Sequence, residues 1–397
     1  MPKEKQKYIP GPLKLNSQIK LTHNTNTIPV PFLRRTPLGL VETSHNKKTQ
    51  ANRKDIEEML YSPGDKSICP ITPLAGRYHE SNNLSFGYGD LPGWRVDMED
   101  DIAAHYPMRM EGLFGGDDFG VFGVFDGHGG ELVSKFVAEN INSELLKELS
   151  KAKVGKIDDE NQVVVQCLTL ACEAVDKMIQ EQGTKLPGGS TGVIALVSSQ
   201  KIFIANVGDS RAVIVNCDGD GSVIGQALST DHNASIASER ARVEASGSEV
   251  IEIKIEGEPT MYKIKKKGGQ GHDMISVSRA FGDFDYKGNE ELSLRDQALI
   301  PTPEITVRNR EGNDVMLLLA CDGIWDVVSN DEAAKIVHRV ATEGKLKESG
   351  SGEKKSKALA IACDMLLLEC LKRDSRDNMT AMIVQWDKTV EGKKLGF

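Results

Sequence analysis

Continuous apolar runs mark the strands expected in this 397-residue chain. An apolar side chain at nearly every position of a strand indicates that both faces of its sheet are covered. Between these runs lie stretches with apolar residues three or four positions apart, which is the spacing of a helix with one buried face. The expected strands are 120–125, 192–198, 202–207, 315–320 and 381–385, and the expected helices are 131–149, 163–179, 331–342 and 357–371.

Local signals add detail to this pattern. Ser329 and Glu332 form a Ser-x-x-Glu capping box at the start of the helix expected over 331–342. The strands 202–207 and 212–215 are joined by too few residues for a parallel crossover, so we expect them to form an antiparallel hairpin. Antiparallel strands with both faces covered predict two sheets packed together and flanked by helices.

Two regions differ from this compact domain, which is expected over residues 81–390. Residues 1–80 are rich in proline, which favours extended segments and turns. This N-terminal arm is predicted to be partly disordered or wrapping, with Ile28, Val30, Phe32 and Leu40 as the side chains that could pack onto the body. The polar, Gly- and Lys-rich stretch near 251–273 is predicted to be an exposed loop or flap, and 344–357 a charged linker.

Charge is divided unevenly along the chain. Residues 1–54 hold eleven Lys and Arg against two acids, whereas the rest holds 38 basic and 56 acidic residues. The acidic body argues against nucleic-acid binding, because phosphate backbones bind to clustered positive charge, but it suits a protein that concentrates divalent cations. For the basic arm, contact with an acidic partner, a membrane surface or the chain's own domain stays open beside a solvated tail.

The sequence predicts neither a membrane span nor a secretory signal. Its apolar runs stop far short of twenty residues, and the charged N-terminal segment is not followed by an apolar stretch. The seven cysteines, mostly inside apolar runs, fit reduced buried thiols better than disulfides. We therefore expect a protein of the cytoplasm, with the nucleus as a further location. We also expect it to be a monomer.

Acidic residues stand at the ends of three expected strands, as Asp126, Asp322 and Asp377. Each has an ordinary explanation, since Asp-Gly is a turn signal and acidic runs are usually solvated. If the three strands point their ends at one region, however, the carboxylates repel one another unless a cation neutralises them. Oxygen ligands favour Mg²⁺ or Mn²⁺ over zinc, for which the eight scattered histidines offer no ligand spacing.

Seven short motifs occur along residues 84–387. They are Gly93-Trp-Arg95-Val-Asp-Met-Glu99-Asp100, Asp126-Gly127-His128-Gly129, Gly189-Ser-Thr-Gly192, Gly208-Asp209-Ser-Arg211, Ser278-Arg-Ala-Phe-Gly-Asp283-Phe-Asp285-Tyr, Ala320-Cys-Asp322-Gly-Ile-Trp-Asp326 and Arg376-Asp377-Asn378-Met. In this order they resemble the metal-dependent protein phosphatase family, also called the type 2C protein phosphatases. The resemblance implies an α+β fold, a four-layer α/β/β/α sandwich of two antiparallel sheets, and hydrolysis of phosphoserine and phosphothreonine in phosphorylated protein substrates.

The resemblance also implies two Mg²⁺ or Mn²⁺ ions, with a weaker third, and a role for each motif residue. The implied ligands are Asp126, which bridges the two ions, Glu99 and the Gly127 carbonyl on one ion, Asp322 and Asp377 on the other, Asp100 through bound water, and Asp209 and Asp326 with Asp322 at the third ion. Arg95 is implied to bind the substrate phosphate, a task that suits its bidentate guanidinium.

General chemistry supports the same scheme. A water that bridges two cations loses its proton near neutral pH and becomes a nucleophile in line with the scissile bond. The cations also neutralise charge on the phosphoryl oxygens, so no phosphoenzyme is needed. The leaving alkoxide requires a proton, and His128, beside Asp126, is the expected donor because a free imidazole has a pKa of about 6.5.

Other interpretations of single residues stay open. His128 could serve a structural hydrogen bond, and Arg95 a surface ion pair. Gly-Asp209-Ser is common in hairpin turns as well as at metal sites. Asp283 and Asp285 could simply order their loop, and Cys321 fits a buried, inert thiol. The long basic flap leaves the choice of substrate open.

Three other functions compete with a protein phosphatase. An inactive scaffold would be expected to lose acids that this chain keeps, whereas a metal phosphatase for small molecules would share every motif. A cysteine-dependent phosphatase is suggested by the Cys-x₅-Arg spacing of Cys370 and Arg376. That chemistry needs a glycine-rich phosphate loop after the cysteine, and residues 371–375 contain an aspartate and no glycine.

Overall fold

The structure is a computed structural model that describes residues 84–110, 112–152, 159–255, 260–266, 268–269, 274–343, 352–386, 388–390 and 393–395. The arm predicted over 1–80 lies outside the described residues, and so do residues 344–351 of the predicted linker. Within the described ranges, no helix combines the length and the apolar character that a membrane span requires.

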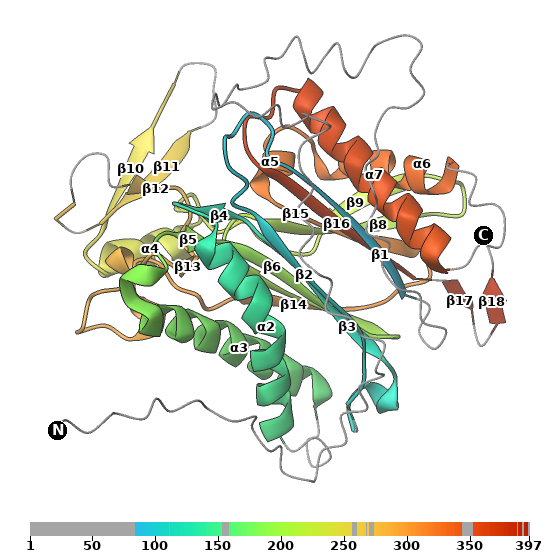
Figure 1. The fold of residues 1–397 in the computed structure, drawn as a ribbon, viewed down its shortest axis with the longest axis horizontal. Coiled ribbons are helices and arrows are strands. Elements are labelled where there is room, and N and C mark those ends of the chain that lie inside the picture. Colours follow the sequence, from blue (N-terminus) through green and yellow to red (C-terminus); the bar gives the residue numbers. More distant parts are fainter. Residues whose placement is uncertain are drawn as a thin grey trace, which may run out of the picture.

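Two five-stranded antiparallel sheets lie at the centre of the molecule (Figure 1). The first has the order β1-β16-β15-β8-β9, with strands Leu84–Leu91, Met379–Trp386, Asp314–Ala320, Arg211–Cys217 and Val223–Ala227. The second has the order β14-β7-β6-β3-β2, with strands Glu304–Asn309, Lys201–Val207, Gly192–Val197, Phe119–Phe125 and Asp101–Met108.

Helices cover the outer face of each sheet (Figure 1). The pair α2 (Leu132–Lys151) and α3 (Glu160–Gln182) shares an apolar core with the second sheet. The pair α6 (Asn330–Glu343) and α7 (Gly352–Lys372) shares another with the first sheet. The four-layer α/β/β/α sandwich of antiparallel sheets is therefore confirmed.

The continuous apolar strands supply two cores at once. In β3 every residue is buried, and alternate side chains face opposite ways. Phe122 and Val124 belong to the core between the sheets, whereas Phe119, Val121 and Phe125 pack beneath α2 and α3. Because neither face of the strand meets water, β3 has no alternation of polar and apolar residues.

The hairpin predicted for 202–207 and 212–215 is wrong. β7 pairs with β6 and β14 in one sheet, whereas β8 pairs with β15 and β9 in the other. The short connection excludes a parallel crossover, but it can pass between stacked sheets, which lie about 10 Å apart. Gly208 makes the crossing at φ 102°, where an added Cβ would lie 2.7 Å from the Thr191 side chain. The crossing carries Asp209.

The predicted flap is partly a small sheet rather than a loop. Its described strands, β10 (Glu249–Ile253), β11 (Met261–Lys265) and β12 (Met274–Ile275), pair antiparallel in that order. This flap sheet rests on a fourth apolar cluster through the buried side chain of Ile264. Residues 256–259, 267 and 270–273 of the predicted flap lie outside the described part of the chain.

Shorter elements complete the described fold. The capping box at α6 is present: the Ser329 N–H donates to a Glu332 carboxylate oxygen at 3.1 Å, and the Glu332 N–H donates to Ser329 Oγ at 3.4 Å. α7 begins at Gly352, five residues before its predicted start. The remaining elements are α4 (Ala237–Ala245), α5 (Asp322–Trp325), β4 (Gly127–His128), β5 (Gly189–Ser190), β13 (Phe281–Gly282), β17 (Lys388–Val390), β18 (Lys393–Leu395) and four short 3₁₀ turns.

Candidate metal centre

The predicted site residues come together at one end of the two sheets. They stand at the ends of β3, β15 and β16, before β2, and in the crossing from β7 to β8. There they surround a cavity of about 470 Å³. Eight of the ten line it: Arg95, Glu99, Asp126, Gly127, His128, Asp209, Asp322 and Asp377. The other two, Asp100 and Asp326, are close enough to this group to share its electrostatics.

The carboxyl groups of this cluster are buried together without enough positive charge. Burial raises the pKa of Asp126 well above its ordinary value, and the charges of Asp100 and Asp322 raise it further. Burial likewise raises the pKa of Asp209 well above its ordinary value and that of Asp326 to about 6. Ionising all these carboxyl groups at neutral pH costs a large amount of free energy, unless bound cations neutralise their charge.

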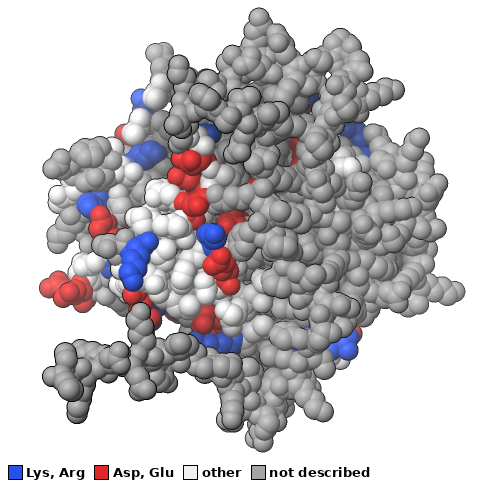
Figure 2. Space-filling model, in the orientation of Figure 1, with Lys and Arg blue, Asp and Glu red and all other residues white. Residues whose placement is uncertain are grey.

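The donor set fits hard divalent cations. Asp100 Oδ1 and Asp322 Oδ1 are buried and accept no hydrogen bond from the described part of the protein. Carboxylate and carbonyl oxygens are the ligands that Mg²⁺ and Mn²⁺ prefer. The residues present therefore match the metals that the sequence predicts. Figure 2 shows acidic side chains gathered along the middle of the described part of one face of the molecule.

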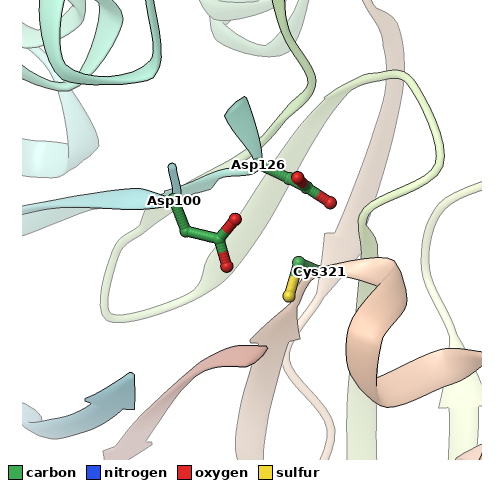
Figure 3. A group of neighbouring side chains, drawn as sticks. All are labelled: Asp100, Asp126 and Cys321. Carbon is green, nitrogen blue, oxygen red and sulfur yellow. The ribbon is translucent and has the colours of Figure 1, made fainter. Parts of the chain in front are cut away.

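The side chain of Asp100 is held by Thr380, a residue that the sequence motifs did not single out. Thr380 Oγ1 donates to Asp100 Oδ2 at 2.6 Å, and the Thr380 N–H donates to Cys321 Sγ at 3.1 Å. Figure 3 shows Asp100, Asp126 and Cys321 side by side, and their ligand atoms lie within 4.8 Å of one another. Burial raises the pKa of Cys321 well above its ordinary value, so its thiol stays protonated.

The loop that carries Arg95 and Glu99 is held by Asn378. The Asn378 amide group donates to the carbonyls of Pro92 and Asp97 at 3.1 and 3.0 Å. Its oxygen accepts the Glu99 N–H at 2.8 Å. These contacts explain the asparagine in the Asp-Asn motif, which ties the start of β16 to a loop 279 to 286 residues earlier.

Gly127 is required by a close backbone approach. A Cβ at this position would lie 2.2 Å from the Glu99 carbonyl oxygen. The same oxygen accepts a hydrogen bond from Ser134 of α2. Any side chain at position 127 would therefore displace the loop that carries Glu99.

Arg95 is exposed at the cavity and already has a carboxylate partner. Its Nη2 lies 2.7 Å from Asp377 Oδ2, and its Nε donates to the Arg376 carbonyl at 3.2 Å. The structure thus contains the surface ion pair considered for Arg95, and it places that pair beside the acids of the cavity.

His128 is paired with an acid that the sequence analysis left among loop residues. Its Nε2 lies 2.6 Å from Asp283 Oδ2. Burial alone would lower the pKa of His128, but the hydrogen bond and charge of Asp283 raise it above its ordinary value. Asp285, two residues later, instead pairs with Lys266 at 2.8 Å. The motif contains both acids, and only the fold distinguishes them.

Cys370 has none of the surroundings of a catalytic cysteine. It lies inside α7, fully buried in the apolar core beneath that helix. Burial raises the pKa of its thiol to about 12, whereas a nucleophilic cysteine needs a depressed pKa. The Cys-x₅-Arg spacing is therefore a coincidence of sequence.

Comparison with known proteins agrees with these features. Residues 84–379 match the family model described as Protein phosphatase 2C. Probable protein phosphatase 2C 45 of Oryza sativa subsp. japonica is 32% identical over 81% of this chain and 95% of its own length. Protein phosphatase ppm-1.A of Caenorhabditis elegans is 30% identical over 79% of this chain, which spans only 62% of that relative.

The fold has solved counterparts. The crystal structure of serine-threonine phosphatase 2C from Toxoplasma gondii superposes with a TM-score of 0.60 at 23% identity, covering 79% of this chain and 98% of that chain. The structure of a C. elegans sex determining protein superposes with a TM-score of 0.58 at 22% identity, covering 84% and 70%. The family model matches residues 84–379, and the rice relative is covered over 95% of its own length. The chain therefore belongs to the protein phosphatase 2C family.

Proposed function

We propose that this chain is a metal-dependent phosphatase that hydrolyses phosphoserine and phosphothreonine in proteins. One observation carries the proposal: acids from five separate segments meet in a single cavity, with buried carboxylate oxygens that no described donor satisfies. Membership of the protein phosphatase 2C family supports the substrate class. The monomeric state and the cytoplasmic or nuclear location expected from the sequence remain predictions.

Mg²⁺ or Mn²⁺ is the proposed cofactor. Asp126, Glu99 and the Gly127 carbonyl would hold one ion, and Asp126, Asp322 and Asp377 a second. Asp100 would act through bound water, and Asp209 and Asp326 would hold a weaker third ion with Asp322. When bound, the ions activate water as the nucleophile and offset charge on the phosphoryl oxygens.

The two cationic side chains have separate proposed tasks. Arg95 binds the substrate phosphate through its planar guanidinium, because it is exposed at the cavity beside the acids. Its present partner, Asp377, is a proposed metal ligand, so a cation there would compete with Arg95 for that carboxylate. His128 donates a proton to the leaving oxygen, and Asp283 holds the ring by Nε2, which leaves Nδ1 to deliver the proton.

The leaving group tests this assignment. We expect His128→Gln to lower kcat for a phosphothreonine peptide about 10²-fold to 10³-fold, because an alkoxide leaves poorly without a proton. The loss should be much smaller for p-nitrophenyl phosphate, whose phenolate leaves without help. Asp283→Asn should give the same pattern with a smaller loss, because it weakens the hydrogen bond that holds the His128 ring.

Asp285→Asn is the matched control, because it removes an acid of the same turn without touching His128. It should leave both rates close to those of the wild type. Equal losses on both substrates in the His128 variant would show that this histidine is structural. Hydrolysis of small esters with no turnover of phosphopeptides would favour the small-molecule phosphatase instead.

A further inference from the structure

Two exposed apolar side chains line the cavity, which also includes the less exposed Ile275 and Val277. Val96 is 59% exposed and Met274 is 37% exposed, and both line the cavity. They come from different parts of the chain: Val96 follows Arg95 in the loop between β1 and β2, and Met274 begins β12 of the flap sheet. Single exposed apolar residues are ordinary, but two that share one binding cavity indicate a contact made with a ligand.

Both side chains are held by ordered neighbours. The loop of Val96 is held by Asn378, which binds the carbonyls of Pro92 and Asp97 on either side. Met274 is opposite Lys265 in the flap sheet, and the next residue, Ile275, packs on the apolar cluster beneath it. Lys263 Nζ donates to Ser276 Oγ at 2.5 Å and fixes the following residue. A preformed contact surface costs little ordering entropy when a ligand binds.

Arg95 relates this surface to the phosphate. Val96 directly follows Arg95 in the chain, and both line the cavity together with Met274. A peptide whose phosphate binds to Arg95 therefore enters the cavity that Val96 and Met274 line, and the residues next to its phosphoresidue are the ones within reach of that surface.

Building on the proposed function, we propose that Val96 and Met274 form a specificity subsite for an apolar side chain directly flanking the phosphoserine or phosphothreonine. The subsite selects substrates by the apolar area that it buries. It contributes to peptide selection and takes no part in the chemical step.

A peptide series tests the subsite on the full chain with Mn²⁺. Phosphothreonine peptides that differ only in a flanking residue, Val, Ala, Glu or Lys, are placed on either side of the phosphoresidue in turn. We expect kcat/KM to be about fivefold to tenfold higher for Val than for Ala on one side, since half-burying a valine has an effect of that order. The Glu and Lys peptides should show no gain over Ala, because a charged side chain loses hydration on an apolar surface.

Variants of the two side chains then test whether they cause the preference for a flanking valine. Val96→Ser and Met274→Ser should each remove most of the Val-to-Ala ratio, and Met274→Leu should keep it. Because the ratio is taken within each variant, a general loss of activity cancels. Val307→Ser is the matched control, since Val307 is also 37% exposed but lies on β14, outside the cavity lining. It should leave the ratio unchanged.

The outcomes separate this subsite from the proposed function. Equal kcat/KM for all peptides, a preference for Lys, or a Val preference that survives both serine variants would overturn the subsite and leave the phosphatase intact. Failure to hydrolyse any phosphopeptide with Mn²⁺ present would overturn the proposed function, and the subsite with it.

Discussion

Asp126→Asn is expected to abolish phosphate release from a phosphothreonine peptide, with a fall of at least about 10³-fold in kcat. Two bound cations supply several kcal/mol of transition-state stabilisation, and each 1.36 kcal/mol is worth about tenfold in rate. Asp126 is the proposed ligand of both ions, and its buried neighbours include Asp100 and Asp322. Asparagine keeps the shape of the side chain, so the fold should be retained.

Asp209→Asn should act differently from Asp126→Asn. Asp209 lies in the crossing between the sheets and is proposed for the weaker third ion, so we expect about a tenfold loss that excess Mn²⁺ partly restores. A Mn²⁺ titration of kcat measures both variants, with Asp220→Asn, on an exposed turn outside the cavity lining, as the control. Wild-type turnover by the Asp126 variant would contradict the proposed metal centre.

Asp377→Asn should lose most activity, whereas Cys370→Ser should keep turnover close to that of the wild type. Asp377 lines the cavity, while Cys370 is enclosed in the core beneath α7. A hydroxyl in that core costs about 1–3 kcal/mol of stability, so the Cys370 variant should unfold at a lower temperature. Measuring kcat/KM together with thermal unfolding separates the two effects.

Iodoacetamide offers an independent check on the same cysteine. The folded protein should be labelled at Cys370 slowly, because its thiol is buried and its pKa is raised to about 12. An inactive Cys370→Ser variant that is fully folded, combined with an active Asp377→Asn variant, would support the cysteine mechanism instead.

The layers of the fold could be predicted because burial leaves a direct mark on the sequence. Strands such as β3 and β15 are apolar at nearly every position, which requires cover on both faces. The pairing of β7 and β8 could not be predicted by the same means. A short connection fits a hairpin and a crossing between stacked sheets equally well, and the apolar pattern of the two strands is the same in both cases.

The residues of the cavity were predictable where they stand in a motif beside a strand end, as Asp126 and Asp322 do. Their supporting contacts were not. Thr380 holds Asp100 across 280 positions of sequence, and Asp283 holds His128 across 155. Such contacts depend on how strands are ordered within a sheet, and local spacing carries no record of that order.

Metal dependence is the claim on which the proposed function rests, and one measurement tests it most directly. The full chain is stripped with excess EDTA, and phosphate release from a phosphothreonine peptide is followed as Mn²⁺ or Mg²⁺ is added back. We predict no release above background in EDTA and recovery of turnover as the free cation rises, because the buried carboxylates need the ions to share one cavity. Undiminished release in excess EDTA would contradict it.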